Sequence, residues 1–332
     1  MINVAQTLIR NTDSVFARAY LGVRPERPAL MSFLFHSLFR DEREIAMNHV
    51  DPLQRTTVAQ FRQFIEYYLE HGYTFIDPQD VLNGLKADRK YALITFDDGY
   101  FNNALALPIL NEFRVPATFF ISANHVRDNK CFWWDVLHRE RCQRGASPQQ
   151  IYREGAAMKS MTTEAMEVQL TRHFGTDAFR PRSDIDRPFT PSELRDFASN
   201  PYVHIGNHTA NHGILTNYPP DQVREQVAGA QAMLTEMTGK TPISIAYPNG
   251  GHSLEVVRIC REAGLKVGFT VRPEKSALPL GEPDSDLLRL GRFCPHGESS
   301  IIGQCRTYRS DVLVYGLFRD TYLRLVRGKV AQ

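Results

Sequence analysis

Short apolar runs alternate with longer amphipathic stretches along most of this chain. Each apolar run is continuous and short, which favours strands buried on both faces of a sheet. The amphipathic stretches repeat their apolar residues at helical spacing. The predicted strands are 28–37, 91–96, 116–122, 202–206, 242–248 and 266–271, and the predicted helices are 57–72, 103–113, 221–239 and 253–264. This alternation predicts an α/β fold in which helices cover a parallel sheet or barrel.

Residues 125–187 break this rhythm. They are rich in charge and helix formers, contain few strand signals, and include Trp133, Trp134 and Asp135. We interpret this stretch as a helical insertion between two βα units. Its aromatic residues either pack in a core of the insertion or shape access to a site.

The C-terminal stretch 306–329 places basic residues among apolar ones at helical spacing. A basic amphipathic helix either packs on its own domain or lies on an anionic membrane surface. We therefore divide the chain into an N-terminal helical extension (1–27), a main domain (28–305) that contains the insertion, and a C-terminal amphipathic helix (306–332).

Composition narrows the functional classes. The chain has 332 residues and a formal net charge of +2, so no strong electrostatic field favours binding to nucleic acid. Its five cysteines form no CxxC pair, which argues against a disulfide framework or a thiolate zinc site. The first residues do not resemble a signal peptide, and no apolar stretch is long enough to span a membrane. These features predict a soluble, cytoplasmic protein.

Asp97 and Asp98 directly follow the predicted strand 91–96. The carboxyl ends of parallel strands carry the active sites of α/β folds. One Asp-Gly pair alone would indicate a turn. Two adjacent acids at a strand end point in different directions, so one carboxylate can bind a metal while the other stays free as a base.

His208 and His212 follow the predicted strand 202–206 and are four residues apart, so they would share a face over one helical turn. Thr209 excludes the HExxH zinc-protease motif, which needs a glutamate there. Two imidazoles and one carboxylate are typical of a catalytic zinc site and also of non-haem iron oxygenases. The oxygenase alternative leaves the second acid without a role.

A third candidate element is AYPNGGH, residues 246–252, at the end of another predicted strand. Pro-Asn-Gly-Gly indicates a turn. Its place in the same series of strand ends also allows backbone N–H groups to face a developing oxyanion.

These three elements together resemble a known family. TFDDG (95–99), HTANH (208–212) and the strand–YPNG element (243–250) are similar to three ordered motifs of the polysaccharide deacetylases, the NodB-homology or carbohydrate esterase family 4 group. The resemblance covers residues 28–122 and 188–272. It implies a distorted (β/α)7 barrel and a divalent metal that supports hydrolysis of an N-acetyl group on a sugar.

The resemblance also implies the roles of individual residues. Asp98, His208 and His212 would be the metal ligands, with a metal-activated water as the nucleophile and Asp97 as the base. The metal would be zinc, with cobalt and nickel as alternatives. Tyr247, Pro248 and Asn249 would line the substrate pocket, with the backbone at Tyr247 as an oxyanion donor.

The chain departs from the family pattern at two points. The third motif begins Ile245–Ala246, without the arginine that steadies the base in many members. No late Leu-x-His strand supplies the acid. Some exopolysaccharide members carry that strand early, in permuted order, and SFLFHS resembles it, which assigns the acid to His36. His296, in RFCPHG, is the alternative.

The expected function is a metal-dependent N-deacetylase in surface or capsular polysaccharide or glycolipid biosynthesis. Its substrate would be an N-acetylated saccharide, lipid- or nucleotide-linked, and the C-terminal helix would allow peripheral contact with the inner membrane face. Two alternatives stay open. One is an O-acetyl esterase or non-sugar amidase of the same fold, and the other is a catalytically idle carbohydrate-binding protein.

Overall fold

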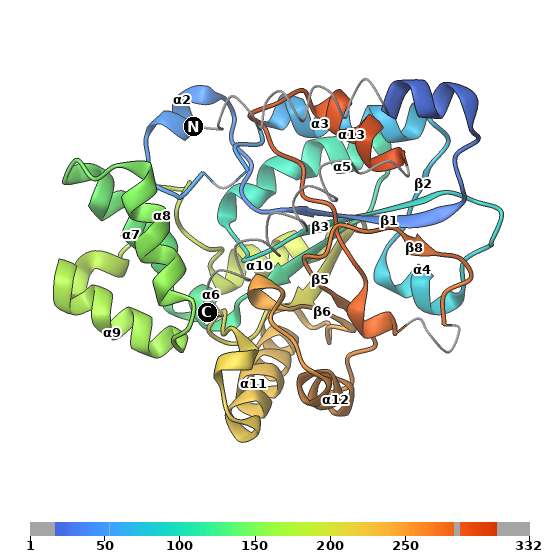
Figure 1. Ribbon diagram of the computed structural model, residues 1–332. Helices are drawn as coiled ribbons and strands as arrows, with labels where there is room; N and C mark the ends of the chain where they lie inside the picture. The colour runs from blue at the N-terminus through green and yellow to red at the C-terminus, as the bar shows by residue number, and fades with distance from the viewer. Residues whose placement is uncertain (1–16, 53, 282–285, 311–332) are drawn as a thin grey trace, which may run out of the picture.

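A computed structural model describes residues 17–52, 54–281 and 286–310 (Figure 1). The strands are β1 (Ala29–Phe35), β2 (Thr74–Phe75), β3 (Tyr91–Phe96), β4 (Ala117–Ile121), β5 (Val203–Asn207), β6 (Ser244–Ala246), β7 (Val267–Phe269) and β8 (Ser276–Ala277). The main helices are α2 (Glu42–Ala46), α3 (Val58–Glu70), α4 (Pro78–Asn83), α5 (Leu107–Phe113), α6 (Ala123–Asp128), α7 (Trp133–Gln143), α8 (Pro148–Met158), α9 (Thr163–Phe174), α10 (Pro191–Ala198), α11 (Pro220–Thr238), α12 (Leu254–Glu262) and α13 (Ile301–Arg309). The predicted alternation of strands and helices is confirmed.

The strands form one curled sheet in the order β7-β6-β5-β4-β3-β1-β8, with β2 paired to the first residues of β3. The pairs from β1 to β7 are parallel, and β8 runs antiparallel to β1. In the register of β1 and β3, Phe35 lies opposite Phe96. The residues that follow these two strands therefore leave the sheet side by side.

A short segment before α13 links strand β7 to strand β1. Leu290 forms a parallel bridge with Phe269 of β7, and Phe293 forms one with Phe33 of β1. Their backbone N–H groups donate to Gly268 and Ser32 respectively, each at 2.8 Å. The sheet thereby curls into the distorted (β/α)7 barrel that was expected.

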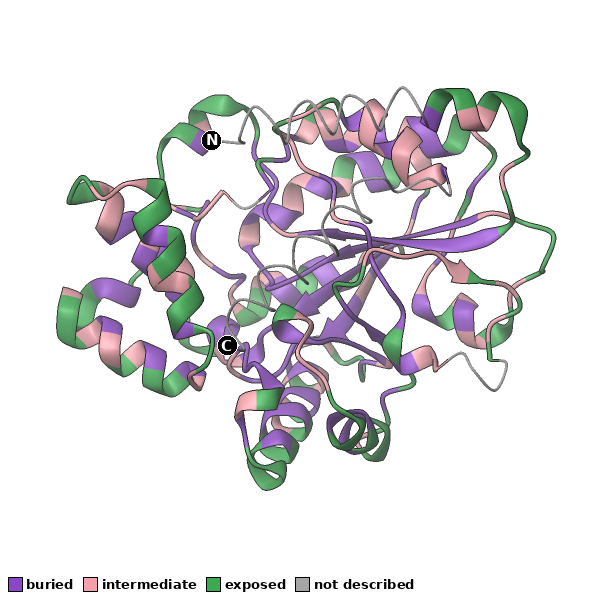
Figure 2. Cartoon of the chain, viewed as in Figure 1, coloured by how far each residue is buried: buried purple, intermediate pink, exposed green. Residues whose placement is uncertain are grey.

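Aromatic packing between the strands and α3 forms the largest core. The ring centroids of Phe33 and Phe64 are 4.8 Å apart, and those of Phe96 and Phe119 are 4.9 Å apart. The side chain of Thr57 caps α3 in a capping box, so the helix begins where the sequence predicts it. Figure 2 shows that the central strands β1 and β3 to β7 are almost entirely buried, whereas the surrounding helices expose their outward faces.

The predicted insertion is helical and groups to one side of the barrel as α7, α8 and α9 (Figure 1). It has its own apolar core, in which Trp133, Met166 and Leu170 are almost completely buried. The interpretation of these residues as a packed helical insertion is confirmed. The second tryptophan, Trp134, is only partly buried, and its ring contacts that of His212.

The terminal segments differ in part from the predicted boundaries. Residues 17–23 are helical, and the rest of the predicted N-terminal extension before them lies outside the described residues. Helix α13 begins at Ile301, so the predicted boundary between 305 and 306 cuts through a helix. It packs on α3, where Arg309 donates to the Tyr67 hydroxyl at 2.9 Å. The stretch from 311 onward, which carries most of the predicted amphipathic helix, lies outside the described residues.

In the part of the chain that the structure describes, none of the helices is both long enough and apolar enough to cross a bilayer.

Candidate active site

The predicted site residues collect at the carboxyl ends of neighbouring strands. His36 follows β1, Asp97 and Asp98 follow β3, and His208 follows β5. The backbone N–H of Asp97 donates to the carbonyl of Phe35 at 2.9 Å, which continues the parallel register of the two strands. His36, far from Asp97 in the sequence, is therefore beside it in the fold.

Asp98, His208 and His212 form a compact buried cluster. The Nε2 atoms of both histidines lie 3.3 Å from Oδ1 of Asp98, and one possible ligand atom from each residue falls within 4.8 Å of the others. Ligands at about 2.0–2.1 Å from a tetrahedral zinc would be separated by about 3.3–3.4 Å. Oδ1 of Asp98 is buried and accepts no hydrogen bond with good geometry. The donor set and its spacing therefore fit a divalent cation.

The pKa shifts of Asp98 and His212 favour metal binding, whereas the carboxylates of Asp97 and Asp98 raise the pKa of His208 despite its burial. Burial alone would raise the pKa of Asp98, but the adjacent imidazoles of His208 and His212 lower that pKa far below its ordinary value. Burial lowers the pKa of His212, so its imidazole is neutral near pH 7. An ionised carboxylate and a neutral imidazole are the forms that bind metals.

The histidines reach Asp98 through a loop rather than a helical turn. The sequence placed His208 and His212 on one helical face, and this expectation is wrong, because Thr209 and His212 adopt left-handed φ values of 65° and 52°. The hydroxyl of Thr209 accepts from the backbone N–H of Gly213 at 2.8 Å and closes the loop. Asp98 also has a positive φ, 80°, a strained conformation that is common at functional sites.

Asp97 is held by a residue that the sequence analysis did not identify. Arg292, fully buried in the closing segment, donates from Nη1 and Nη2 to the two oxygens of Asp97 at 2.7 and 2.8 Å. Its remaining donors bond to Oγ1 of Thr95 and the carbonyl of Thr270. Burial would raise the pKa of Asp97, but Arg292, together with the nearby histidines, lowers it. Asp97 is therefore an ionised carboxylate in a fixed orientation.

Arg292 supplies the arginine that is missing from the third motif. The sequence contained one signal for this residue, which was the absence of an arginine before Tyr247. Without that arginine, Asp97 needs a cationic partner from another part of the chain. Arg292 lies in the same RFCPHG stretch as His296, the alternative candidate for the acid.

His36 and Asp98 line one narrow cavity, together with Asp51, Gln54 and Tyr100. The Gln54 amide nitrogen donates to the carbonyls of Leu34 and Pro295 at 2.6 and 3.1 Å. Its Oε1 therefore faces His36 and accepts from Nδ1 at 2.9 Å. This bond leaves Nε2 of His36 as the nitrogen that can exchange a proton with a substrate.

His296 is held in a different place. Its backbone N–H donates to Oε1 of Gln304, and its carbonyl accepts from Nε2 of the same side chain. It is not one of the described residues that line the cavity between His36 and Asp98.

The third motif supports the site but does not offer the expected backbone donor. The N–H of Tyr247 donates to the carbonyl of Phe269 at 3.1 Å as part of the sheet, and the hydroxyl donates to Leu288 at 2.9 Å. The expectation that this N–H faces an oxyanion is wrong, because β7 already occupies it. Pro248 and Asn249 belong to a 3₁₀ turn, Pro248–Gly250. The third motif contacts the Asp98–His208–His212 cluster through Ala246, whose carbonyl lies 2.8 Å from Nδ1 of His208.

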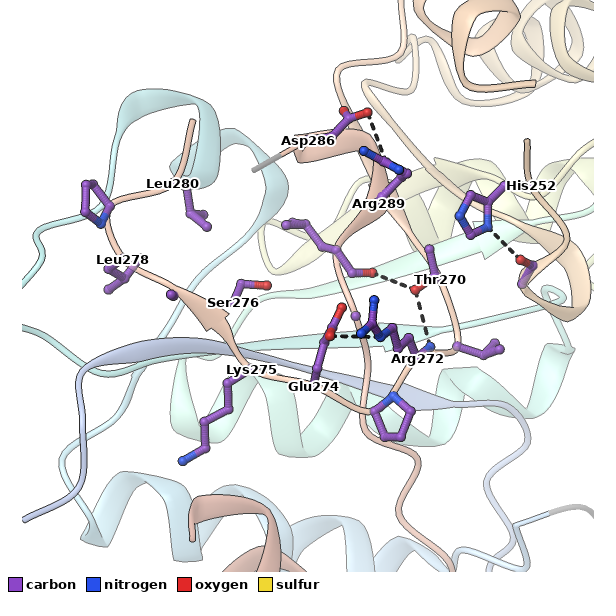
Figure 3. Close-up of a pocket in the computed structure, with 17 residues that line it drawn as sticks. His252, Thr270, Arg272, Glu274, Lys275, Ser276, Leu278, Leu280, Asp286 and Arg289 are labelled. Carbon is purple, nitrogen blue, oxygen red and sulfur yellow. Dashed lines mark hydrogen bonds and ion pairs between the residues drawn. The ribbon is translucent and has the colours of Figure 1, made fainter. Parts of the chain in front are cut away.

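A larger cavity of about 880 Å³ lies on another part of the barrel, between residues 270–280 and 286–291 (Figure 3). Four of its charged side chains form two ion pairs: Arg272 contacts Glu274 at 3.0 Å, and Arg289 contacts Asp286 at 3.2 Å. His36, the two acids and the histidine pair do not line it. Although this cavity is the larger of the two, none of the predicted catalytic or metal-binding residues lines it, so we do not assign the reaction to it.

Sequence comparison identifies the family of this chain. The sequence profile described as polysaccharide deacetylase matches residues 84–268, more than half of the chain. The chain belongs to the polysaccharide deacetylase family. The matched region contains Asp97, Asp98, His208 and His212, whereas His36 and Arg292 lie outside it. In this family member, two residues that lie near the Asp98 cluster in the fold therefore fall outside the region that the profile matches.

Individual relatives of this polysaccharide deacetylase are distant. YxkH of Bacillus subtilis, named as a polysaccharide deacetylase, is 19% identical over 256 residues, which cover 76% of this chain and 68% of YxkH. The crystal structure of BC0361, a polysaccharide deacetylase from Bacillus cereus, has a TM-score of 0.58 at 17% identity and covers 85% of this chain and 69% of its own.

Two further structures align with almost their whole length. The Streptococcus pyogenes deacetylase PplD, solved in complex with acetate, has a TM-score of 0.57 at 18% identity and covers 85% of this chain and 99% of its own. IcaB from Ammonifex degensii has a TM-score of 0.55 at 17% identity, and the match covers 86% of this chain and 99% of IcaB. These likenesses establish the deacetylase fold.

Proposed function

We propose that this chain is a metal-dependent hydrolase that removes an N-acetyl group from a sugar of a surface polysaccharide or of its lipid- or nucleotide-linked precursor. Membership of the polysaccharide deacetylase family supports the reaction class. The observation that carries the proposal is the arrangement of three separate functions in one place. A buried Asp–His–His cluster lies beside an arginine-held carboxylate and beside a histidine with one unoccupied ring nitrogen.

Asp98, His208 and His212 would hold the cation, which we expect to be zinc, with cobalt or nickel as alternatives. Two nitrogens and one oxygen leave open positions, as in catalytic rather than structural zinc sites. When bound, such a cation lowers the pKa of water and polarises a carbonyl oxygen.

Asp97 would act as the general base. Arg292 keeps its carboxylate ionised and points it in one direction, and Oδ2 lies 4.0 Å from Nε2 of His208, at the edge of the cluster. In this position Asp97 takes the proton from the water that attacks the acetyl carbonyl. Because Arg292 already fixes the orientation of the carboxylate, Asp97 does not have to be reoriented before it takes the proton.

His36 would act as the general acid. The bond from Nδ1 to Gln54 leaves Nε2 for this role, and His36 lines the cavity that Asp98 also lines. In protonated form, Nε2 gives its proton to the sugar nitrogen as the carbon–nitrogen bond breaks. The new carbon–oxygen bond yields acetate, and the sugar leaves as a free amine.

The cysteines support the expected cytoplasmic location. All five are free, and Cys131, Cys260 and Cys305 are buried. Free cysteines are typical of a reducing compartment. Contact with the membrane through the C-terminal residues stays part of the proposal as a route to a lipid-linked substrate.

Acetate release with metal analysis tests the proposal. The purified protein is analysed for bound metal and incubated with oligomers of N-acetylglucosamine and N-acetylgalactosamine, and with O-acetylated saccharides as a comparison. We expect bound zinc and acetate release from an N-acetylated sugar, lost after treatment with a chelator and restored by zinc. Release only from the O-acetylated sugars would favour the esterase alternative. Bound sugar without any release would favour a carbohydrate-binding protein.

A further inference from the structure

We propose that Trp134, on the helical insertion, is a positioning residue for the metal ligand His212. Its indole face takes the place of the hydrogen-bond acceptor that normally orients such a ligand. The inference rests on the metal site of the proposed function and assigns part of that site to the insertion, which the sequence had separated from the family motifs.

The two histidines are supported in different ways. Nδ1 of His208 lies 2.8 Å from the carbonyl of Ala246, an ordinary acceptor for a metal-binding imidazole. Nδ1 of His212 is buried and has no hydrogen-bond partner among the described residues. When Nε2 binds a cation, Nδ1 carries the proton, so His212 would present a buried N–H group without an acceptor.

The neighbouring group at His212 is the indole of Trp134. The two ring centroids are 4.5 Å apart, and the planes are inclined by 59°, which is closer to edge-to-face than to parallel stacking. An indole has an electron-rich face that attracts an N–H group or a positively polarised ring. A bound cation draws electron density from the imidazole and strengthens this attraction.

The indole is itself fixed on two sides. Its Nε1 donates to the hydroxyl of Tyr100 at 2.9 Å, and that hydroxyl donates to Oδ2 of Asp135 at 2.6 Å. Phe132 stacks on Trp134 with centroids 4.7 Å apart and an interplanar angle of 17°. Tyr100 follows Asp98 and Gly99 directly in the chain, so this network joins the insertion to the loop that carries the carboxylate ligand.

The adjacent tryptophan has a different environment. Trp133 packs with Leu137, Met166 and Leu170 in the core of the insertion. Trp134 also packs against this core, and its ring centroid is 5.6 Å from that of Trp133, but Trp134 is the one of the two that contacts the ring of His212. A substitution deeper in the same core therefore serves as a control for loss of packing in the insertion.

The experiment compares three variants of Trp134 with Leu170→Ala. Trp134→Phe keeps an aromatic face, Trp134→Leu keeps apolar volume without one, and Trp134→Ala removes both. Leu170→Ala loosens the insertion core without touching His212. Zinc affinity is measured on the metal-free full chain by competition with a chromophoric chelator, and the visible spectrum is recorded after loading with cobalt. Thermal unfolding reports folding separately.

We expect Trp134→Leu and Trp134→Ala to weaken zinc binding about tenfold, the lower end of the loss found when a ligand's support is removed, and to change the cobalt spectrum. Trp134→Phe should stay within about threefold of the unmodified protein, and so should Leu170→Ala despite a lower unfolding temperature. Unchanged zinc affinity in Trp134→Leu would overturn the inference, and so would an equal loss in Leu170→Ala. If the unmodified protein binds no metal, the proposed function itself fails.

Discussion

Arg292 and Asp97 form two parallel hydrogen bonds of 2.7 and 2.8 Å between fully buried groups that are almost two hundred residues apart in the sequence. Such a bidentate pair fixes the direction of the carboxylate as well as its charge. Arg292 lies in the segment that links β7 to β1, and Asp97 is the proposed base. The pair therefore makes the orientation of the base depend on closure of the barrel.

Replacing Arg292 should alter the pH dependence of activity. Asp97 has a lowered pKa in the folded protein, so as a base it is active down to low pH. Arg292→Lys cannot form the paired bonds, which should raise the pKa of Asp97 and move the acidic limb of the rate profile to higher pH. The profile of kcat/KM against pH checks this. An unmoved acidic limb would contradict the role of Arg292.

The same pair should contribute to stability in a defined pH range. Because the pKa of Asp97 is lowered on folding, its contribution is present above the ordinary value of 3.8 and is lost as pH falls through the folded value. Arg292→Met leaves a buried carboxylate alone and should cost about 3–5 kcal/mol at pH 7. Urea unfolding at pH 7 and pH 3 measures the effect. The loss should shrink at the lower pH, and an equal loss at both values would count against this account.

Asp97→Asn should separate catalysis from metal binding. The amide keeps the shape of the side chain but cannot take a proton, so we expect a fall in turnover of about 10²–10⁴-fold with metal still bound. Asp98→Asn, the adjacent control, should lose the metal as well. Elemental analysis alongside acetate release distinguishes the two. Retention of most activity by Asp97→Asn would exclude it as the base.

His36→Ala should reduce turnover on an N-acetylated sugar far more than His296→Ala does. The defect should be smaller on an aryl acetate, whose leaving group needs no proton. Rates on both substrates are compared for both variants. The opposite ranking would assign the acid to His296.

Gln54→Leu should misorient His36, because Oε1 of Gln54 accepts from Nδ1 of that histidine. We expect kcat to fall by about tenfold with little change in KM. Gln304→Leu is the matched control, since Gln304 holds the backbone of His296. Steady-state kinetics of the two variants test this pairing. A larger kcat effect from Gln304→Leu would reject the role given to Gln54.

Gly268→Ala should separate β7 from the segment that carries Arg292. A Cβ at this position would lie 2.4 Å from the carbonyl oxygen of Leu288, a contact that backbone must relieve by moving. We expect a loss of more than about 2 kcal/mol together with reduced activity. Gly229→Ala, in α11 with open space around it, should instead raise stability by about 0.5–1 kcal/mol. Denaturant unfolding compares them, and equal stabilities would contradict the packing argument.

Local pattern was sufficient for most of the secondary structure. The apolar run 91–96 coincides with β3, and the amphipathic stretch 221–239 matches α11, which ends at Gly239 with a φ of 72°. These elements depend on the periodicity of apolar residues and on helix stop signals, and both can be read from a short stretch of sequence. The four residues of the first two motifs could be found for the same reason.

Loop geometry was beyond such reasoning. The spacing of His208 and His212 suits a helix, but the side chains of Asn207 and Thr209 accept backbone hydrogen bonds that hold a turn with two left-handed residues. Side-chain bonds of this kind compete with helix formation, and their outcome depends on the strands around them.

The sequence by itself determined that this chain is an α/β protein with two acids and two histidines at strand ends, and it placed His36 at the end of the first strand. Only the tertiary structure decided which distant groups complete the site. Arg292 reaches Asp97 because the barrel closes between β7 and β1, and Trp134 reaches His212 because the insertion folds back on the first motif. Such contacts arise from strand order and chain closure, which no local pattern of residues encodes.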